Sequence, residues 1–198
     1  MRIAVLTFDG FNELDSFVAA GLLNRLRGRG WQAQICCPSE QVTSMNGVRV
    51  QAQQPLEFAN QADVVLFGSG MQTRAIAEDP SMLERLRLDP RRQLIGAQCS
   101  GTLLMARLGL LGELPACTDL NSKPWVIEAG VRVLDQPFYA EGNLATAGGC
   151  LAAPYLAAWV IARLAGEGAC VEALHYVAPV GEKQAFVERA LTVVRPYL

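Results

Sequence analysis

Cys99 is the residue whose type and setting best fit a chemical role. It lies in the segment AQCSG, residues 97–101, after an apolar pair, Leu94-Ile95, that predicts a short buried strand. A helix-like run, 102–108, follows. Small residues two positions before and after the cysteine are typical of a nucleophile elbow with cysteine in place of serine, because a sharp strand-to-helix turn leaves no room for bulk on either flank.

This turn would place the Cys99 sulfur above the carboxyl edge of a sheet, at the N-terminus of the new helix. The helix dipole and the unpaired N–H groups there favour an anion, so we expect a thiolate to form easily. The alternative is a small cysteine buried at the end of a strand, since free cysteine is among the most buried residue types.

Two other strand ends carry candidate partners for this sulfur. Asp15 lies at or just after the start of the helix that follows the first strand, and it would exchange a proton with Cys99. An N–H group of the turn Gly68-Ser69-Gly70 would form an oxyanion hole together with the N–H of Ser100. The alternatives are a helix cap or an exposed first-turn acid for Asp15, and a simple tight turn for residues 68–70.

Strands and helices alternate along the chain, which predicts an α/β fold with an open, doubly wound, mostly parallel sheet and helices on both faces. Ligands in such sheets bind outside the carboxyl ends of the strands. Asn46-Gly47 predicts a small β-hairpin over 41–50. A helix is expected from the Asp9–Asn12 turn to about Leu26. The expected inner face of that helix comprises Leu14, Phe17, Val18, Gly21, Leu22 and Leu26.

Length and composition are those of one ordinary globular domain covering residues 1–198. The formal charge of 17 − 19 = −2 gives no argument for binding nucleic acid or an anionic membrane. Six cysteines without paired spacing, and a chain that begins directly in a strand, indicate a reduced, cytoplasmic protein. One histidine and scattered cysteines do not predict a metal site, and His175 is expected at a surface or interface.

The chain resembles the ThiJ/PfpI family, of the class I glutamine amidotransferase-like fold, which is flavodoxin-like, over nearly its whole length. The resemblance rests on Glu13-Leu14-Asp15, on the strand and turn VVLFGSG (64–70), on the Cys99 segment, and on segments 115–119 and 141–149. It is most similar to the isocyanide hydratase branch and to the amidotransferase-like domain of some AraC-type regulators. The resemblance implies a homodimer, an acidic residue touching the elbow cysteine at the Asp15 position, and no bound cofactor.

Two positions depart from the family pattern. Phe67-Gly68-Ser69 stands where the family usually has Pro-Gly-Gly, and Asp119 stands where many relatives carry a histidine. Without that histidine the usual proton shuttle for peptidase or amidase chemistry is missing. Asp119 could form a pair with Asp15, one ionised and one neutral. It could equally cap the helix that begins near Lys123 or interact with Lys123.

The expected function is a cysteine-dependent hydratase or hydrolase that acts on a small molecule, with isocyanide hydration as the nearest named example. Cys99 would attack, Asp15 would handle the proton, and Thr118 and Trp125 would line the pocket. The alternative is a non-catalytic ligand-sensing or redox-responsive module, in which Cys99 is oxidised reversibly or binds an electrophile.

Overall fold

A seven-stranded sheet forms the centre of the protein, with strands in the order β5-β2-β1-β6-β7-β9-β8. The computed structural model describes all residues, 1–198. Every neighbouring pair is parallel except the last, which is antiparallel. The strands are β1 (Arg2–Leu6), β2 (Gln32–Cys37), β5 (Gln54–Pro55), β6 (Val64–Phe67), β7 (Leu94–Gln98), β8 (Phe138–Glu141) and β9 (Leu144–Ala147). The predicted doubly wound, mostly parallel sheet is confirmed.

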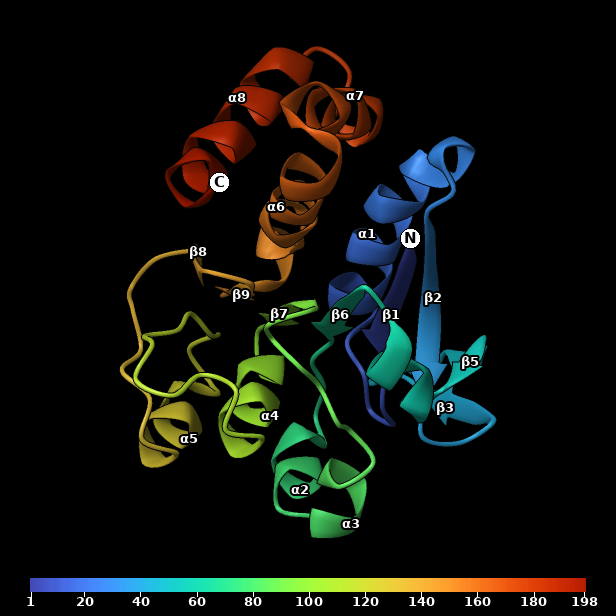
Figure 1. Cartoon of the computed structure of the whole chain (residues 1–198), viewed down its shortest axis with the longest axis vertical. Coiled ribbons are helices and arrows are strands. Elements are labelled where there is room, and N and C mark those ends of the chain that lie inside the picture. Colours follow the sequence, from blue (N-terminus) through green and yellow to red (C-terminus); the bar gives the residue numbers. More distant parts are fainter.

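Helices cover both faces of this sheet (Figure 1). One face carries α1 (Glu13–Leu23), α6 (Ala153–Ala165), α7 (Glu167–Val177) and α8 (Lys183–Val194). The other carries the shorter helices α2 (Thr73–Ala77), α3 (Pro80–Leu83), α4 (Gly101–Arg107) and α5 (Lys123–Glu128). Short 3-10 segments are η1 (Asn24–Arg29), η2 (Leu56–Gln61), η3 (Cys150–Ala152) and η4 (Arg195–Tyr197). None of the helices has the length and apolar character needed to traverse a bilayer.

Alternation along the central strands fills both layers of the core. In β6, Val64 and Leu66 pack toward the side of α1 and α6, while Val65 and Phe67 pack toward the side of α4. Successive side chains of a strand point to opposite faces, so a continuous apolar run of this kind is buried on both sides. Gly96 in β7 makes room for α6, because a Cβ there would lie 2.6 Å from Leu156 Cδ1.

The predicted hairpin is present as a separate antiparallel pair, β3 (Gln41–Thr43) and β4 (Arg49–Gln51), with Gly47 at φ +86° in its turn. Hydrogen bonds connect the hairpin to the first residue of α1. Glu13 accepts hydrogen bonds from Ser44 Oγ at 2.5 Å and from Asn46 Nδ2 at 2.9 Å. These contacts hold the tip of the hairpin, including Met45, beside the carboxyl edge of the large sheet.

The predicted inner face of the first helix is correct for Leu22 and Leu26, which are buried, and wrong for Leu14, Phe17 and Gly21. Leu14 and Phe17 are exposed, and the buried face comprises Asp15, Ser16, Ala19, Ala20, Leu22 and Leu23. Both sides of this helix carry apolar residues, so periodicity alone could not select the inner one. The α-helix also ends at Leu23, and the following residues to Arg29 form a 3-10 segment. Helix α7, which is separated from α6 only by Gly166, was not predicted.

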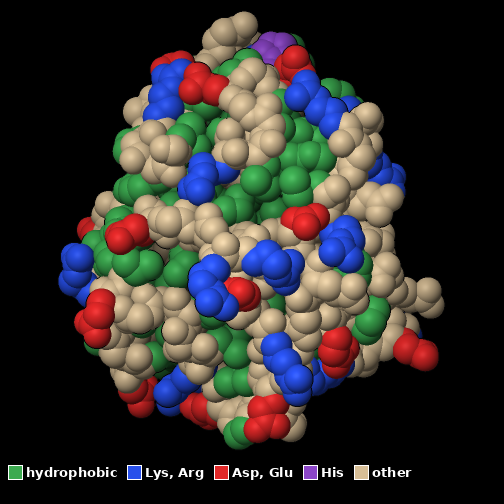
Figure 2. Space-filling model, in the orientation of Figure 1, with side chains coloured by type: hydrophobic (Ala, Val, Ile, Leu, Met, Phe, Trp, Pro, Cys, Tyr) green, Lys and Arg blue, Asp and Glu red, His purple; other side chains and the backbone are tan.

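The surface of the protein carries charges of both signs. Figure 2 shows Lys and Arg side chains interspersed with Asp and Glu over the visible face, without a large area of one sign. The net charge of −2 agrees with this mixed distribution. Steering of a strongly charged partner depends on a broad field of one sign, which this face does not provide.

Candidate active site

Four strand ends meet at one edge of the sheet. Strand order reverses at β1, whose neighbours are β2 on one side and β6 on the other, so the crevice for a ligand is expected at their carboxyl ends. Asp15 follows β1, Ser69 follows β6, Cys99 follows β7 and Cys150 follows β9. All four residues contribute to one cluster at this edge.

The turn at Cys99 is present and has the backbone conformation of a nucleophile elbow. Cys99 has φ +48° and is the only non-glycine residue with positive φ. Its N–H donates to Ala147 O at 2.8 Å, and its carbonyl accepts from Thr118 Oγ1 at 2.8 Å. A left-handed conformation costs a non-glycine residue roughly 1–2 kcal/mol. The surrounding hydrogen bonds hold this strained conformation in place.

Main-chain atoms pack directly against the elbow. A Cβ on Gly101 would lie 2.6 Å from Gly68 O and 2.8 Å from Phe67 O. A Cβ on Gly68 would lie 2.9 Å from Leu6 O. The small residue expected after the cysteine is therefore required by the close approach of two loops.

Replacing Gly101 by alanine is expected to lower the free energy of unfolding by about 1–3 kcal/mol, because backbone atoms cannot move aside as a flexible side chain can. Gly21→Ala is the matched control: Gly21 lies in α1, has no atom within 4 Å of the added Cβ, and should stabilise the protein by roughly 0.5–1 kcal/mol. Urea unfolding of both variants measures the difference. Equal changes in the free energy of unfolding for the two variants would contradict the close main-chain packing around Gly101.

The Cys99 sulfur has three polar neighbours. A carboxylate oxygen of Asp15 and the sulfur of Cys150 lie within 4.8 Å of it and of each other. Gln98 Nε2 donates toward the sulfur at 3.7 Å. Asp15 is only 2% exposed, so the alternative of an exposed acid is wrong. One of its oxygens accepts a hydrogen bond from Ser69 Oγ, and the other, Oδ1, has no partner.

Burial controls the protonation of this cluster. Burial raises the pKa of Asp15, although the hydrogen bond from Ser69 and the nearby thiols of Cys99 and Cys150 oppose the shift. Burial, and then the negative charge of Asp15, raise the pKa of the Cys99 thiol above its usual range. The expected easy formation of a thiolate is therefore not supported while Asp15 is ionised. The two groups titrate as a coupled pair, in which a proton on Asp15 removes the repulsion that opposes a charge on Cys99.

Two backbone N–H groups are free to act as oxyanion donors. In the turn after β6, Gly68 N–H donates to Leu6 O at 3.0 Å and Gly70 N–H donates to Ser100 Oγ at 3.2 Å. The N–H groups of Ser69 and Ser100 have no acceptor within the chain. Among the N–H groups of residues 68–70, that of Ser69 is therefore the candidate oxyanion donor beside the N–H of Ser100. Gly68 and Gly70 shape the turn instead.

A cavity of about 280 Å³ opens above the cluster. Trp125 lines it as predicted, whereas Thr118 does not and instead holds the Cys99 carbonyl. Three apolar side chains, Met45, Met71 and Trp125, form much of its wall, and they come from the hairpin turn, the loop after β6 and α5. The full lining is Asn12, Met45, Ser69, Gly70, Met71, Cys99, Ser100, Asp119, Asn121, Ser122, Trp125 and Cys150.

The side chain of Asp119 caps the turn that leads into α5. Its Oδ1 accepts hydrogen bonds from the N–H groups of Asn121 and Ser122, both at 3.0 Å, just before α5. These contacts correspond to the predicted capping role of Asp119. The predicted interaction with Lys123 is not observed, because no ion pair joins the two side chains. Its second oxygen is buried without a partner, and Asp119 lines the cavity, so its charge also acts on Asp15 and Cys99.

Cys150 is the main residue of the site that the sequence analysis missed. Asn12 Nδ2 donates to its sulfur at 3.1 Å. Together with Asp15 and Cys99 it forms a group of ligand atoms close enough to hold a metal ion, which the argument from scattered cysteines overlooked. A signal was present: Gly148-Gly149-Cys150 lies between an apolar strand-like segment, 144–147, and an apolar helix-like run, 151–164, much as Cys99 lies between a strand and a helix.

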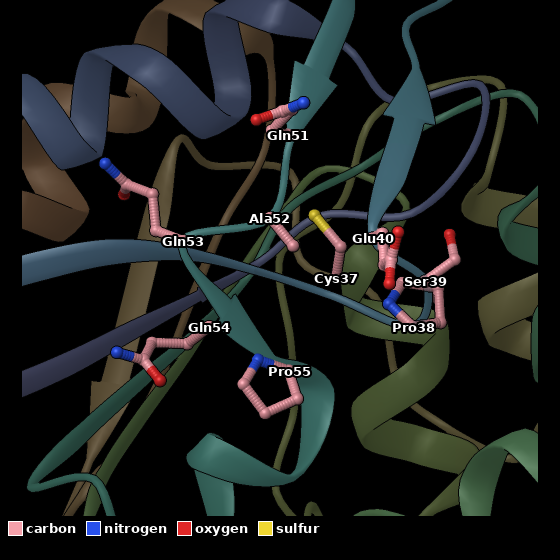
Figure 3. A pocket seen from close by; sticks show the side chains of 9 residues that line it. All are labelled: Cys37, Pro38, Ser39, Glu40, Gln51, Ala52, Gln53, Gln54 and Pro55. Atoms are coloured by element: carbon pink, nitrogen blue, oxygen red, sulfur yellow. The ribbon is translucent and has the colours of Figure 1, made fainter.

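Two other features lie away from this cluster. His175 is exposed on α7. A larger cavity, of about 570 Å³, lies between the end of β2 and the segment 51–55, and Figure 3 shows glutamine side chains, Cys37 and Glu40 around it. Burial raises the pKa of the Cys37 thiol to about 11, so this cysteine is protonated at neutral pH. The cavity has no pair of reactive groups.

A parallel sheet that carries a strained cysteine at a strand-to-helix turn, with a buried acid beside it, defines the class of α/β proteins with an elbow cysteine. The model of the DJ-1/PfpI family matches residues 1–163, and the chain belongs to this family. No curated protein sequence matches the chain.

Solved structures of the same fold cover most of the chain. Drosophila melanogaster DJ-1beta has 22% identity and a TM-score of 0.77, over 88% of this chain and 96% of that one. A mutant of a DJ-1 superfamily protein from Salmonella typhimurium has 24% identity and a TM-score of 0.76, over 89% and 98%. A ThiJ/PfpI family protein from Pseudomonas syringae has 20% identity and a TM-score of 0.77, over 99% and 87%.

Proposed function

We propose that this protein is a cysteine-dependent hydratase or hydrolase of small molecules, similar to isocyanide hydratase, with Cys99 as the nucleophile. The observation that carries the proposal is the placement of the Cys99 sulfur beside Asp15, whose buried Oδ1 has no partner, at the base of a cavity. Burial raises the pKa of this carboxyl group, so it holds a proton at higher pH than a free aspartic acid does and can deliver that proton to a reacting atom.

Isocyanide hydration fits these groups. The Cys99 sulfur attacks the terminal carbon, and the thiol proton passes through Asp15 to that carbon, which gives a thioimidate. Water then adds to the carbon, the sulfur leaves with a proton, and the product is an N-substituted formamide. The Ser69 and Ser100 N–H groups would stabilise the negative charge that develops on the added oxygen.

The size and lining of the cavity favour a small substrate with an apolar substituent. Its volume of about 280 Å³ lies at the lower end of ligand sites. Met45, Met71 and Trp125 offer apolar contacts, whereas Asp15 and Cys99 lie at the reactive end. The lack of a histidine at position 119 argues against peptidase chemistry.

The test is a panel of isocyanides, small amides and α-dicarbonyls assayed with the full chain. We expect formamide production from an isocyanide, followed by NMR, and loss of that activity in proportion to alkylation of Cys99 by iodoacetamide. Failure of every compound, with Cys99 still alkylated, would contradict an enzyme of this kind and favour the second candidate.

The second candidate is a redox-responsive or ligand-sensing module that uses Cys99 without turnover. The observation in its favour is the second thiol, Cys150, within 4.8 Å of the first. Reversible oxidation of Cys99 by mild peroxide, together with no activity across the panel, is the expected result for a sensor.

We further propose that the protein is a cytoplasmic homodimer. Large apolar side chains next to site residues are exposed, at 48% for Leu14, 72% for Met71 and 79% for Leu151. A second copy that covers this apolar rim would exclude water from the cavity. Light scattering after size-exclusion chromatography tests the proposal, and a monomer at micromolar concentration would contradict it.

A further inference from the structure

A second thiol lies in the candidate site, and the proposed reaction makes no use of it. The Cys150 sulfur, the Cys99 sulfur and a carboxylate oxygen of Asp15 lie within 4.8 Å of one another. Cys150 is partly exposed, whereas the other five cysteines are buried. The site therefore holds a pair of thiols, one of which small molecules in solvent can reach.

We propose that Cys150 is a resolving cysteine, which closes a reversible disulfide with Cys99 after a hydroperoxide has oxidised Cys99. The inference rests on the proposed function only in that Cys99 must be a reactive thiol. The disulfide would block the nucleophile and protect it from irreversible oxidation to the sulfinic or sulfonic acid.

The chemistry consists of one oxidation by the peroxide and one condensation that releases water. The Cys99 sulfur attacks a peroxide oxygen, the O–O bond breaks, and the thiol proton goes to the leaving oxygen, which gives a sulfenic acid and an alcohol or water. The Cys150 sulfur then attacks the Cys99 sulfur, the S–S bond forms and the S–O bond breaks. Asp15 carries the Cys150 proton to the leaving hydroxide, which departs as water. A thiol reductant restores both thiols by exchange and is itself oxidised to a disulfide.

The strand arrangement brings the two cysteines together. β7 and β9 are neighbours, with Gln98 opposite Ala147, so both cysteines leave the same edge of the sheet within three residues of that pair. Because a disulfide requires about 2.05 Å between its sulfurs, they must approach by at most about 2.8 Å.

The loop before Cys150 can supply this movement. A Cβ on Gly148 would lie 2.4 Å from Thr118 O, so the chain is held at that point. Gly149, at φ +89°, has open space around it, and Cys150 begins a 3-10 segment of only three residues. The 3-10 segment runs directly into α6, and the Gly149 carbonyl accepts a hydrogen bond from Gln98 Nε2 at 2.6 Å, so a rotation at Gly149 that moves Cys150 must break this bond.

The groups around Cys150 suit an attacking thiol. Burial and the charge of Asp15 raise the pKa of the Cys150 thiol, and the hydrogen bond that Asn12 Nδ2 donates to its sulfur at 3.1 Å opposes this shift in favour of the thiolate. Asp15 Oδ1 is buried without a partner and is free to accept the thiol proton. Both side chains lie on the segment that begins α1, opposite the loop that carries Cys150.

The experiment treats the reduced full chain with stoichiometric hydrogen peroxide in the presence of a chelator, followed by intact mass and peptide mapping. We expect wild-type protein to lose two hydrogen atoms, to yield a peptide that links Cys99 and Cys150, and to revert with dithiothreitol. Cys150→Ser is expected to gain oxygen atoms on Cys99 instead. Cys170→Ser, which changes a buried thiol bonded to Ala158 O, should behave as wild type.

Three results would overturn the inference. The first is sulfinic acid on Cys99 in wild-type protein without a disulfide and at the rate seen in Cys150→Ser, which leaves a reactive Cys99 and the proposed function intact. The second is a disulfide between Cys99 and a different cysteine. The third is a Cys99 that reacts with neither peroxide nor iodoacetamide, which would also remove the basis of the proposed function.

Discussion

Cys99→Ala is expected to lower kcat/KM for the substrate found in the panel by at least about 10³-fold, because it removes the sulfur that forms the covalent intermediate. The substitution removes one sulfur atom and leaves the backbone contacts to Ala147 O and Thr118 Oγ1 in place. Steady-state kinetics measure the effect, and circular dichroism confirms that the variant is folded.

Cys170→Ser provides the matched control for this loss. Cys170 is also fully buried, but it lies in α7 and takes no part in the cluster around Asp15. Its activity should stay within a factor of two or so of wild type. An activity of Cys99→Ala within tenfold of wild type would show that the elbow cysteine is not the nucleophile.

Asp15→Asn is expected to change activity and stability in opposite directions. The amide cannot carry the proton, so kcat should fall by about 10²- to 10⁴-fold and lose its dependence on the Asp15 titration. The free energy of unfolding at pH 7 should rise, because a buried carboxylate is replaced by a neutral group of the same shape that can still accept the hydrogen bond from Ser69.

The sign of the stability change follows from the raised pKa of Asp15. The folded protein holds this proton more tightly than the unfolded chain, so the contribution of Asp15 is favourable below the unfolded pKa, near 3.8, and is lost as pH rises through the folded value. Urea unfolding at pH 7 and pH 4 should show a gain for Asp15→Asn at the higher pH that shrinks at the lower.

Asp79→Asn is the control of opposite sign. Asp79 caps α3, and its hydrogen bond with Ser81 lowers its pKa, so ionisation favours the folded state there. Its substitution should lower stability at pH 7 or leave it unchanged. If Asp15→Asn instead lowers the free energy of unfolding as much as removal of one partner of a buried ion pair does, Asp15 is ionised and well paired in the folded protein.

Local patterns accounted for most of the fold. Runs such as Val64–Phe67 predicted buried strands, Asn46-Gly47 predicted the hairpin, and the segment around Cys99 predicted a sharp turn into a helix. The rule that carboxyl ends of parallel strands share an edge then predicted that Asp15 and Ser69 would approach Cys99. These inferences need only the nearest neighbours in the chain and the direction of the strands.

Features that depend on which elements are neighbours could not be predicted in the same way. Cys150 joins the site only because β9 pairs with β7, a pairing that the order of residues does not determine. Thr118 was expected to line the pocket, but its hydroxyl donates a hydrogen bond to the Cys99 carbonyl instead. The exposure of Leu14 and Phe17 depends on which side of a helix with two apolar sides meets the sheet.

The elbow and the cavity above it are built from different kinds of atoms. Gly101 packs against the main-chain oxygens of Phe67 and Gly68, so the position of the elbow is set largely by main-chain atoms. Met45 in the hairpin turn and Trp125 in α5 belong to elements outside that turn, whereas Met71 directly follows Gly70 of the loop that packs against it. Substrate preference can therefore be redesigned at Met45 and Trp125 while the reactive centre stays unaltered, which makes this part of the scaffold a modular one.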